Sequence, residues 1–170
     1  DGFPAEYVAR LKKIRYKANL CLLLELSRPL SPYYWISVTD PCSPFVAVIE
    51  HTNLAPAADY GAHLVYLSRY LDAGDEWYQA ADDEVIKLFT GYLTKLFPSW
   101  DKASVLNARL YRARYAQPVV VTGYGGILPG YETPIPHLYL ACMAQIYPED
   151  RGQNYSIKTG LEIAALVGES

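Results

Sequence analysis

The sequence predicts an α+β fold, with a mostly antiparallel (mixed) β-sheet flanked by helices. Runs of β-branched and aromatic residues follow one another across short turns, which is typical of antiparallel strands. Other segments space their apolar residues at helical intervals, and they stand between groups of strands, so a meander-like sheet with added helices is expected. At 170 residues the chain can bury a real core, and we expect one domain over residues 1–170.

The N-terminal region predicts a short helix and then a buried strand. The segment PAEYVARLKKI, from Pro4, has apolar residues at helical spacing and basic residues on the other side, as in an amphipathic helix. The next segment, YKANLCLLLELSRPL (residues 16–30), holds an apolar run of strand length that Pro29 closes. We expect this run to form a buried strand of the sheet.

Three further strands are predicted after this one. YYWISVT (residues 33–39) and FVAVIEHT (residues 45–52) are aromatic and β-branched runs joined by the turn cluster DPCSP. Their close spacing indicates neighbouring antiparallel strands. HLVYLSRYL (residues 63–71) has the same composition and follows a polar loop rich in Ala and Pro.

The spacing of the apolar residues changes after residue 81. In DDEVIKLFTGYLTKLFP they form a helical stripe behind an acidic start. Asp82 is the expected N-cap of this helix, and Pro98 ends it. Residues 105–121 match both a helical and an alternating pattern. Of the two, we favour an extended segment that ends at Pro118.

Composition excludes several classes of function. The 15 Lys and Arg and 18 Asp and Glu are scattered and give a net charge of −3, so we expect no nucleic-acid binding. No apolar run approaches the roughly 20 residues that span a bilayer. The cysteines, Cys21, Cys42 and Cys142, are odd in number and lack metal-ligand spacing. We therefore expect a cytoplasmic protein with no transmembrane segment and no metal site.

The sequence identifies no catalytic residue. His51, His63 and His137 are far apart in the sequence, and we expect structural roles for all three. The Gly-rich loop TGYGGILPG has a leucine in the place of the third glycine of a G-x-G-x-x-G phosphate-binding motif. We expect this loop to be a flexible turn.

The C-terminal region, residues 138–167, predicts a strand, a turn and a helix. Leu138–Cys142 is strand-like, and Asn154–Val167 is helical. The N-terminus of a helix carries unsatisfied N–H donors and partial positive charge, so it suits a phosphate or another electron-rich group. Gly152 would let the backbone approach such a ligand, and Gly160 is expected to pack closely inside the helix. A purely structural helix start, capped by an Asp or Asn side chain, remains the alternative.

Three stretches of the sequence resemble one group of enzymes. The run YLACMAQIYPEDRGQNYSIKTGLEIA (residues 139–164) resembles the C-terminal flavin-binding segment of FAD-dependent amine oxidases and protoporphyrinogen-oxidase-like enzymes. RARYAQPV (residues 112–119) is similar to the stretch that precedes this segment, and residues 21–54 are similar to the substrate-domain sheet of the bacterial branch. The resemblance implies the substrate-domain fold of these enzymes and FAD as the cofactor.

The resemblance also implies positions for individual residues. The residues implied to lie near the flavin are Ala144, Gln145, Arg151, Gly152, Gln153 and Asn154. Those implied to lie on the substrate side are Tyr115, Ala116 and Gln117, and we expect the strand aromatics Tyr34 and Trp35 to line the substrate cavity. Met143 departs from the pattern, because many relatives carry an acidic ribityl-binding residue there.

The resemblance further implies a protein longer than this chain. Residues 1–170 contain no N-terminal strand, G-x-G-x-x-G turn and helix of the kind that holds the ADP half of FAD. The chain begins with Asp1, and its only methionine is Met143. We therefore expect the substrate-binding portion of an FAD-dependent oxidoreductase, whose partners are a missing Rossmann-type domain and a small-molecule substrate. Alone, this portion is expected to be inactive and to bind FAD weakly or not at all.

A second hypothesis comes from a different class of function. The Tyr-rich strands also fit a self-contained module that binds a small ligand or a protein through one face of its sheet, without catalytic activity. Dimerisation through the sheet remains open under either hypothesis.

Overall fold

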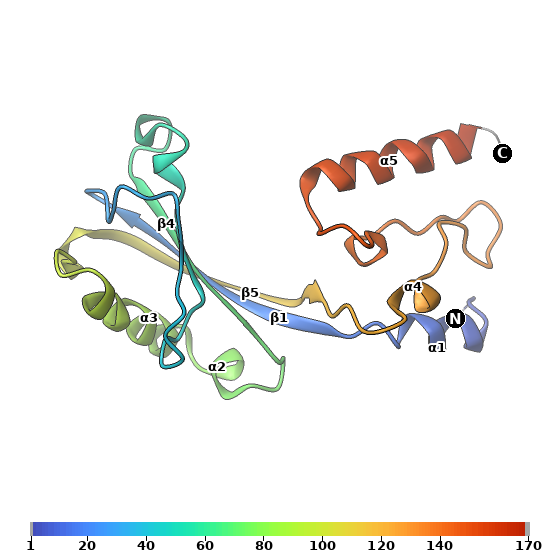
Figure 1. Ribbon diagram of the computed structural model, residues 1–170, viewed down its shortest axis with the longest axis horizontal. Coiled ribbons are helices and arrows are strands. Elements are labelled where there is room, and N and C mark those ends of the chain that lie inside the picture. The colour runs from blue at the N-terminus through green and yellow to red at the C-terminus, as the bar shows by residue number, and fades with distance from the viewer. Residues whose placement is uncertain (1, 169–170) are drawn as a thin grey trace. The chain divides into compact units, whose positions relative to one another are not determined.

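The computed structural model describes residues 2–168, which fall into two compact units (Figure 1). We call Lys17–Ala116 the sheet unit, and Asp1–Tyr16 with Gln117–Ser170 the terminal unit. Among the described residues, no helix combines the length and the apolar character that crossing a membrane requires.

The strands form one five-stranded sheet in the order β2-β3-β4-β1-β5. They are β1 (Tyr16–Leu26), β2 (Trp35–Ser37), β3 (Ala47–Glu50), β4 (His63–Leu71) and β5 (Val105–Pro118). The pairs β1–β4, β3–β4 and β2–β3 are antiparallel. β5 also runs against β1, because Ser27 N donates to Ser104 O at the end of one strand and the start of the other, at 2.9 Å. The predicted fold class and the extended form of residues 105–118 are confirmed.

Helices occupy both units of the described chain. The α-helices are α1 (Ala5–Leu11), α2 (Glu76–Gln79), α3 (Asp82–Leu96), α4 (Tyr124–Ile127) and α5 (Gln153–Gly168), and the 3-10 helices are η1 (His51–Asn53), η2 (Ala57–Asp59), η3 (Lys102–Ser104) and η4 (Met143–Gln145). Helices α1, α3 and α5 confirm the three helices that the spacing of apolar residues predicts.

The main hydrophobic core lies between the sheet and the helices on one of its faces. Figure 1 shows α2 and α3 on the same side of the sheet. Alternate side chains of β1 are buried on this side: Leu20, Leu22, Leu24 and Leu26. Phe89 of α3 packs edge-on against Phe45, with 5.5 Å between the ring centroids. Full burial of one such side chain contributes roughly 1.5–3 kcal/mol, so this layer holds α3 on the sheet. The opposite side of the sheet we call the open face.

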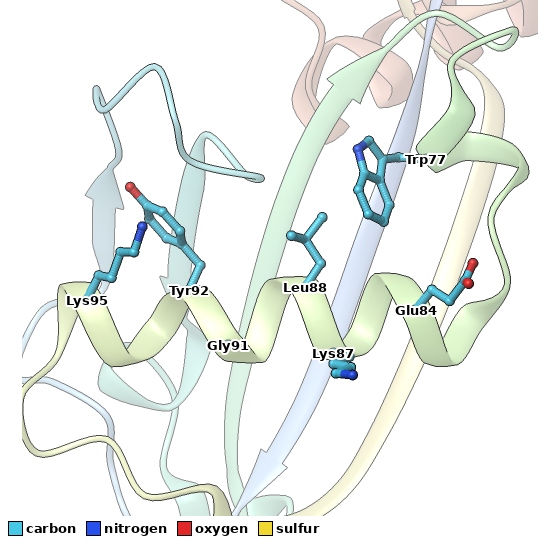
Figure 2. Close-up of a pocket in the computed structure, with 7 residues that line it drawn as sticks. All are labelled: Trp77, Glu84, Lys87, Leu88, Gly91, Tyr92 and Lys95. Atoms are coloured by element: carbon cyan, nitrogen blue, oxygen red, sulfur yellow. The ribbon is translucent and has the colours of Figure 1, made fainter.

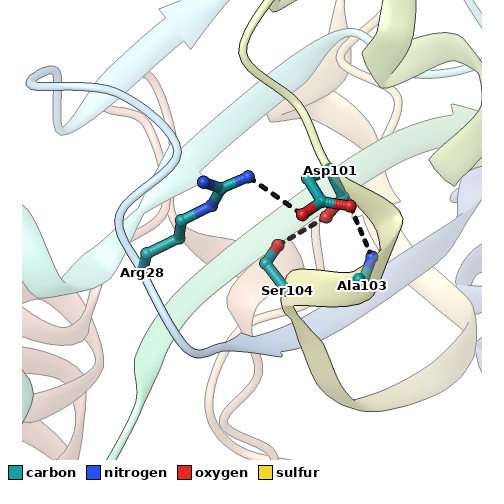
Figure 3. A network of polar contacts seen from close by, with 4 residues as sticks. All are labelled: Arg28, Asp101, Ala103 and Ser104. Carbon is teal, nitrogen blue, oxygen red and sulfur yellow. Dashed lines mark hydrogen bonds and ion pairs between the residues drawn. The ribbon is translucent and has the colours of Figure 1, made fainter.

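Two polar clusters fix β5 at its start and along its length. Asp101 accepts a bond from Ala103 N at 2.9 Å and pairs with Arg28 at 3.2 Å, so the turn before β5 is tied to the end of β1 (Figure 3). Further along, the Arg112 guanidinium donates to Tyr78 O at 3.0 Å and pairs with Asp82.

Asp82 is the first residue of α3, and its carboxylate pairs with Arg112. The prediction of Asp82 as the N-cap is wrong, since Ala81 holds that position.

Two expectations for the terminal unit also need correction. Residues 138–142 form no strand, and their only ladder contact is an isolated bridge between Glu132 and Tyr139. The Gly-rich loop is not simply a flexible turn, because Tyr124–Ile127 forms the short helix α4. Gly123 precedes this helix with a φ of 75°, a left-handed conformation that favours glycine.

One contact of the sheet unit predicts how stability changes with pH. The Tyr92 hydroxyl donates to the Asp40 carboxylate, and this bond raises the pKa of Tyr92 to about 12 and lowers the pKa of Asp40. Because the Tyr92 phenol keeps its proton to a higher pH in the folded chain than in the unfolded chain, it contributes stability below its ordinary pKa of 10.0. This stability is lost as the pH rises toward 12. The Asp40 contribution is present above its ordinary pKa of 3.8 and is lost as the pH falls through the lowered value.

We expect Tyr92→Phe to flatten both pH dependences. Urea unfolding between pH 10 and 12, and again below pH 3.8, should show a smaller loss of unfolding free energy in Tyr92→Phe than in the unchanged chain. Tyr33→Phe is the control, because the Tyr33 side chain is 64% exposed. Equal pH slopes for the two variants would contradict the role of the Tyr92–Asp40 bond.

Candidate functional site

Ala144 lies inside the core of the terminal unit. It is 1% exposed and packs in a cluster with Ile14 and Tyr124. The Tyr124 hydroxyl donates to Ala144 O at 2.9 Å, and burial raises the pKa of Tyr124. The Ala144 side chain therefore supports the fold of this unit, and a bound cofactor would meet the backbone around it at most.

Gln145 uses its side-chain amide to hold neighbouring loops together. Its Oε1 accepts from Cys142 N at 2.8 Å, and its Nε2 donates to Leu140 O at 3.1 Å and to Gly130 O at 3.2 Å. These bonds satisfy the amide within the chain. Gln145 thus positions the segment before α5. Its side-chain amide already uses its hydrogen-bonding groups within the chain, so it is poorly suited to bind a ligand.

The other four residues implied to bind the cofactor form the start of α5. Arg151 and Gly152 precede the helix, and Gln153 and Asn154 are its first, exposed residues. The first turn holds no acidic side chain, and the first-turn amides of a helix have no intrahelical acceptor. A Cβ on Gly152 would lie 2.6 Å from Asn154 Oδ1. The glycine thus leaves the space that the Asn154 side chain occupies.

Acidic residues adjoin this helix start. Asp150 Oδ1 accepts from Arg151 N at 2.9 Å, and both Glu149 and Asp150 are exposed. A negatively charged ligand would therefore approach the first turn from the side away from these carboxylates.

Polar contacts tie helix α5 to the segments that precede it. The Tyr131 hydroxyl donates to Glu162 Oε2 at 2.7 Å, a bond that raises the pKa of Tyr131. The Ser156 hydroxyl lies 2.8 Å from Met143 Sδ, so the methionine that departs from the family pattern contacts α5. No residue of α5 is buried, and Ile157 and Leu161 are 65% and 68% exposed. Helix α5 therefore presents an apolar stripe that the described chain leaves open.

Gly160 does not pack as the sequence predicts. A Cβ built on it has no atom within 4 Å. Within the described chain, close packing does not explain a glycine at this point of the helix.

The terminal unit fits only part of an FAD molecule. A cavity of about 180 Å³ lies between η4 and α5, lined by Ala141, Cys142, Met143, Ile146, Ser156 and Thr159. Pockets that enclose even a drug-sized ligand, smaller than FAD, are roughly 300–1,000 Å³. The start of α5, with its donors, exposed polar side chains and glycine, fits the diphosphate and ribityl part of the cofactor. The isoalloxazine ring needs walls that this unit does not supply.

The open face of the sheet carries a row of large side chains. Strand register places Trp35 opposite Ile49, Ile49 opposite Tyr66, and Tyr66 opposite Leu23. Directly opposed residues of antiparallel strands lie on the same face of a sheet. Trp35, at the β2 edge and 55% exposed, therefore begins a row that crosses four strands.

The sequence suggests an aromatic sheet face, but it does not single out the cluster of aromatic residues that lies at this row. We call His51, Tyr60, Tyr66 and Tyr111 the aromatic patch. His51 Nε2 lies 2.8 Å from Tyr60 Oη, and its ring is 6.3 Å from that of Tyr66. Burial, together with nearby Cys21, Tyr60 and Tyr111, raises the pKa of Tyr66. The alternation within β4, where Leu64, Tyr66, Ser68 and Tyr70 share one face, is the sequence signal that could have indicated this patch.

The five residues predicted to lie on the substrate side do not form one cluster. Trp35 is on β2 and Tyr115 is on β5, and these strands are the two edges of the sheet. With about 4.8 Å between neighbouring strands, four steps separate them by roughly 19 Å. Tyr34 precedes β2 and is 40% exposed. Gln117 lies in the terminal unit, where its Nε2 donates to Pro118 O at 3.2 Å.

Solved structures of enzymes share this fold. An oxidoreductase from Methanosarcina mazei superposes with a TM-score of 0.63 at 19% identity, over 95% of this chain and 36% of that chain. A candidate protoporphyrinogen oxidase from Exiguobacterium sp. 255-15 gives a TM-score of 0.67 at 13% identity, over 95% and 37%. Reduced UDP-galactopyranose mutase gives 0.52 at 15% identity, over 70% and 26%. No family model and no curated protein match the sequence.

These similarities define the class of fold. The chain has the fold of one portion of these enzymes and spans about a third of the length of the first two. The resemblance to protoporphyrinogen-oxidase-like enzymes is thus confirmed for the fold. The roles of the individual site residues remain predictions.

Proposed function

We propose that the chain is the substrate-binding portion of an FAD-dependent oxidoreductase of the amine-oxidase and protoporphyrinogen-oxidase-like type, and that it acts with a separate dinucleotide-binding part. The fold carries this proposal. Nearly the whole chain, 95%, superposes on an oxidoreductase and on a candidate protoporphyrinogen oxidase, yet the match takes up only 36% and 37% of those chains. The sequence also lacks a dinucleotide-binding glycine turn.

The exposed stripe of α5 supports this two-part arrangement. Ile157 and Leu161 are one helical turn apart, so they lie on the same side of α5, and both are more than half exposed. Large apolar side chains that line up on one side of a helix are suited to burial against another surface. We assign the dinucleotide-binding part as the partner that covers this stripe.

Different parts of the chain have different tasks in the proposed enzyme. FAD, when bound, accepts two electrons from the substrate, while the protein contributes orientation, shielding and electrostatics. The first turn of α5 offers backbone donors to the polar part of the cofactor, and Arg151 adds a positive charge beside it. The aromatic patch and Trp35 offer apolar surface that orients a substrate and excludes water. Among the described residues we assign no general base.

Retention of FAD tests this proposal. The longer protein should retain FAD through purification, and residues 1–170 alone should retain much less. Gly152→Val in the longer protein should weaken FAD binding by about tenfold, or about 1.4 kcal/mol, because its side chain would displace Asn154, whose Oδ1 lies 2.6 Å from a Cβ at this position. The readout is the absorbance of protein-bound flavin during titration.

Gly74→Val is the matched control for Gly152→Val. Gly74 is exposed, and a Cβ built on it meets nothing within 4 Å. We expect this variant to bind FAD like the unchanged protein. Equal FAD binding by both variants, or a longer protein without a dinucleotide-binding motif, would overturn the proposal.

A self-contained binding module is the second candidate, and the aromatic patch favours it. The patch combines half-buried rings with a polar His51–Tyr60 pair, as many ligand sites do. In this case residues 1–170 alone should bind a ligand or protein tightly. Tyr66→Ala should abolish that binding and Gly152→Val should leave it unchanged, which calorimetry on the isolated chain can measure.

A further inference from the structure

The two edges of the sheet differ in charge. Strand β5, at one edge, carries Arg109, Arg112 and Arg114, and charged side chains at an edge discourage pairing with a further strand. Strand β2, at the other edge, lies in a stretch that has no charged residue between Arg28 and Asp40. Among the residues that the structure describes, no strand lies beside β2 on its outer side. The β2 edge is therefore open to pairing with another strand.

The charges that flank this stretch are engaged within the chain. Arg28 pairs with Asp101 at 3.2 Å. The Asp40 carboxylate accepts from the Tyr92 hydroxyl, which lowers the pKa of Asp40, and the charge of Lys95 lowers this pKa further. Figure 2 shows Tyr92 and Lys95 next to each other on α3. A strand that pairs with β2 thus meets an uncharged stretch whose flanking charges already have partners.

The backbone of β2 presents donors and acceptors on its outer side. Tyr34 O and Val38 N are bonded to the neighbouring β3 segment, at 2.8 and 2.9 Å. Bonded and non-bonded residues alternate along antiparallel strands, so Trp35 and Ser37 direct their N–H and C=O groups away from β3. Both residues are exposed. Two residues, each with one donor and one acceptor, therefore face outward at this edge.

These outward groups are self-complementary. When two copies of β2 pair antiparallel about a two-fold axis at Ile36, Trp35 of each copy lies opposite the partner's Ser37. Each of these two pairs can exchange two backbone hydrogen bonds. Directly opposed residues share a face, so the open faces of both copies lie on one side of the joined sheet. Tyr33, 64% exposed, and Trp35, 55% exposed, add apolar surface at the contact.

We propose that two copies of this chain pair through their β2 edges, with Trp35 opposite the partner's Ser37. A second copy suits this edge because an uncharged stretch meets its own copy without repulsion, and because a two-fold axis matches its donors to its acceptors. Only three residues of each copy form β2, so the contact belongs to the weak, transient class of interfaces. The proposal concerns the sheet unit alone and does not depend on the flavin function.

Analytical ultracentrifugation of residues 1–170 tests the proposal. The average mass should rise with protein concentration, from that of one chain toward that of two. NMR over the same concentrations should show shifts of the Trp35 and Ser37 amides and slower exchange of these amides with solvent. The Ile36 amide should change less, because Ile36 is paired with Val48 within the chain.

Two double variants test the register. Trp35→Lys with Ser37→Lys places lysine opposite lysine in both pairs, whereas Trp35→Lys with Ser37→Glu places lysine opposite glutamate. Like charges directly opposite each other destabilise a strand pair and opposite charges stabilise it. The lysine–glutamate variant should therefore associate about tenfold more tightly than the lysine–lysine variant. Both lose the same tryptophan and should unfold at similar urea concentrations, which separates association from folding.

A matched variant at the other edge is the control. Tyr111→Lys with Ala113→Lys makes the same change of charge, at the same spacing, at two exposed residues of β5. It should associate like the unchanged chain. The proposal is overturned if the unchanged chain stays monomeric at every concentration, or if the lysine–lysine and lysine–glutamate variants at β2 associate equally. It is also overturned if the β5 variant loses association, because the contact then lies at β5.

Discussion

Replacing Glu50 by alanine is expected to lower the free energy of unfolding by about 2–5 kcal/mol. Glu50 is 1% exposed, and its carboxylate accepts from Leu30 N at 2.8 Å and from Ser31 N at 2.7 Å. The Ser31 hydroxyl also donates to it, at 3.1 Å. One side chain of β3 thus satisfies the backbone of the loop that follows β1. Removing it leaves two amide donors without their acceptor in a largely buried place, and this accounts for the size of the loss.

Urea unfolding with two further variants checks this prediction. Glu50→Gln keeps one carbonyl oxygen and should lose less stability than Glu50→Ala. Glu149→Ala removes an exposed carboxylate and should change the unfolding free energy by no more than about 0.5 kcal/mol. If Glu50→Ala is as stable as Glu149→Ala, then Glu50 does not hold the loop in solution.

The case of Glu50 shows which parts of the fold could be predicted from the sequence. The strand that contains Glu50 could be predicted, because β-branched and aromatic runs with turn residues between them are local signals. The role of the Glu50 side chain could not be predicted, because its partners Leu30 and Ser31 lie about 20 residues away in sequence. Residues 105–118 were ambiguous for a related reason. Their backbone becomes extended through pairing with β1, which the local pattern does not encode.

The candidate site shows the same division between local and distant contacts. The start of α5 could be predicted, since its glycine, polar residues and apolar spacing stand together in the sequence. The burial of Ala144 depends on Tyr124, 20 residues earlier. The aromatic patch joins η1, the loop after η2 and strand β4 through ring contacts, and Tyr111 of β5 lies near enough to affect the pKa of Tyr66. Such clusters depend on strand register, which pairs residues that are remote in the sequence.

The apolar stripe of α5 gives the second large expected effect. The double change Ile157→Asp and Leu161→Asp should leave the stability of the isolated chain within about 0.5 kcal/mol of its original value, because surface changes away from packed features have small effects. In the proposed longer enzyme the same change should weaken FAD retention by about 100-fold or more. Burial of two such side chains contributes about 3 kcal/mol or more, and 1.4 kcal/mol corresponds to tenfold in binding.

Lys158→Ala is the control for this double variant. Lys158 is exposed on α5 and lies 3.9 Å from Glu162, one turn along the helix. It follows Ile157 directly, and neighbouring residues of a helix do not share a face, so its loss should change FAD retention by less than about threefold, as for an exposed ion pair. Should the double variant retain FAD as well as Lys158→Ala does, the stripe does not contact a dinucleotide-binding part. A loss of stability above about 1 kcal/mol in the isolated chain would instead mean that the stripe is buried within this chain, because only buried apolar side chains cost that much to replace.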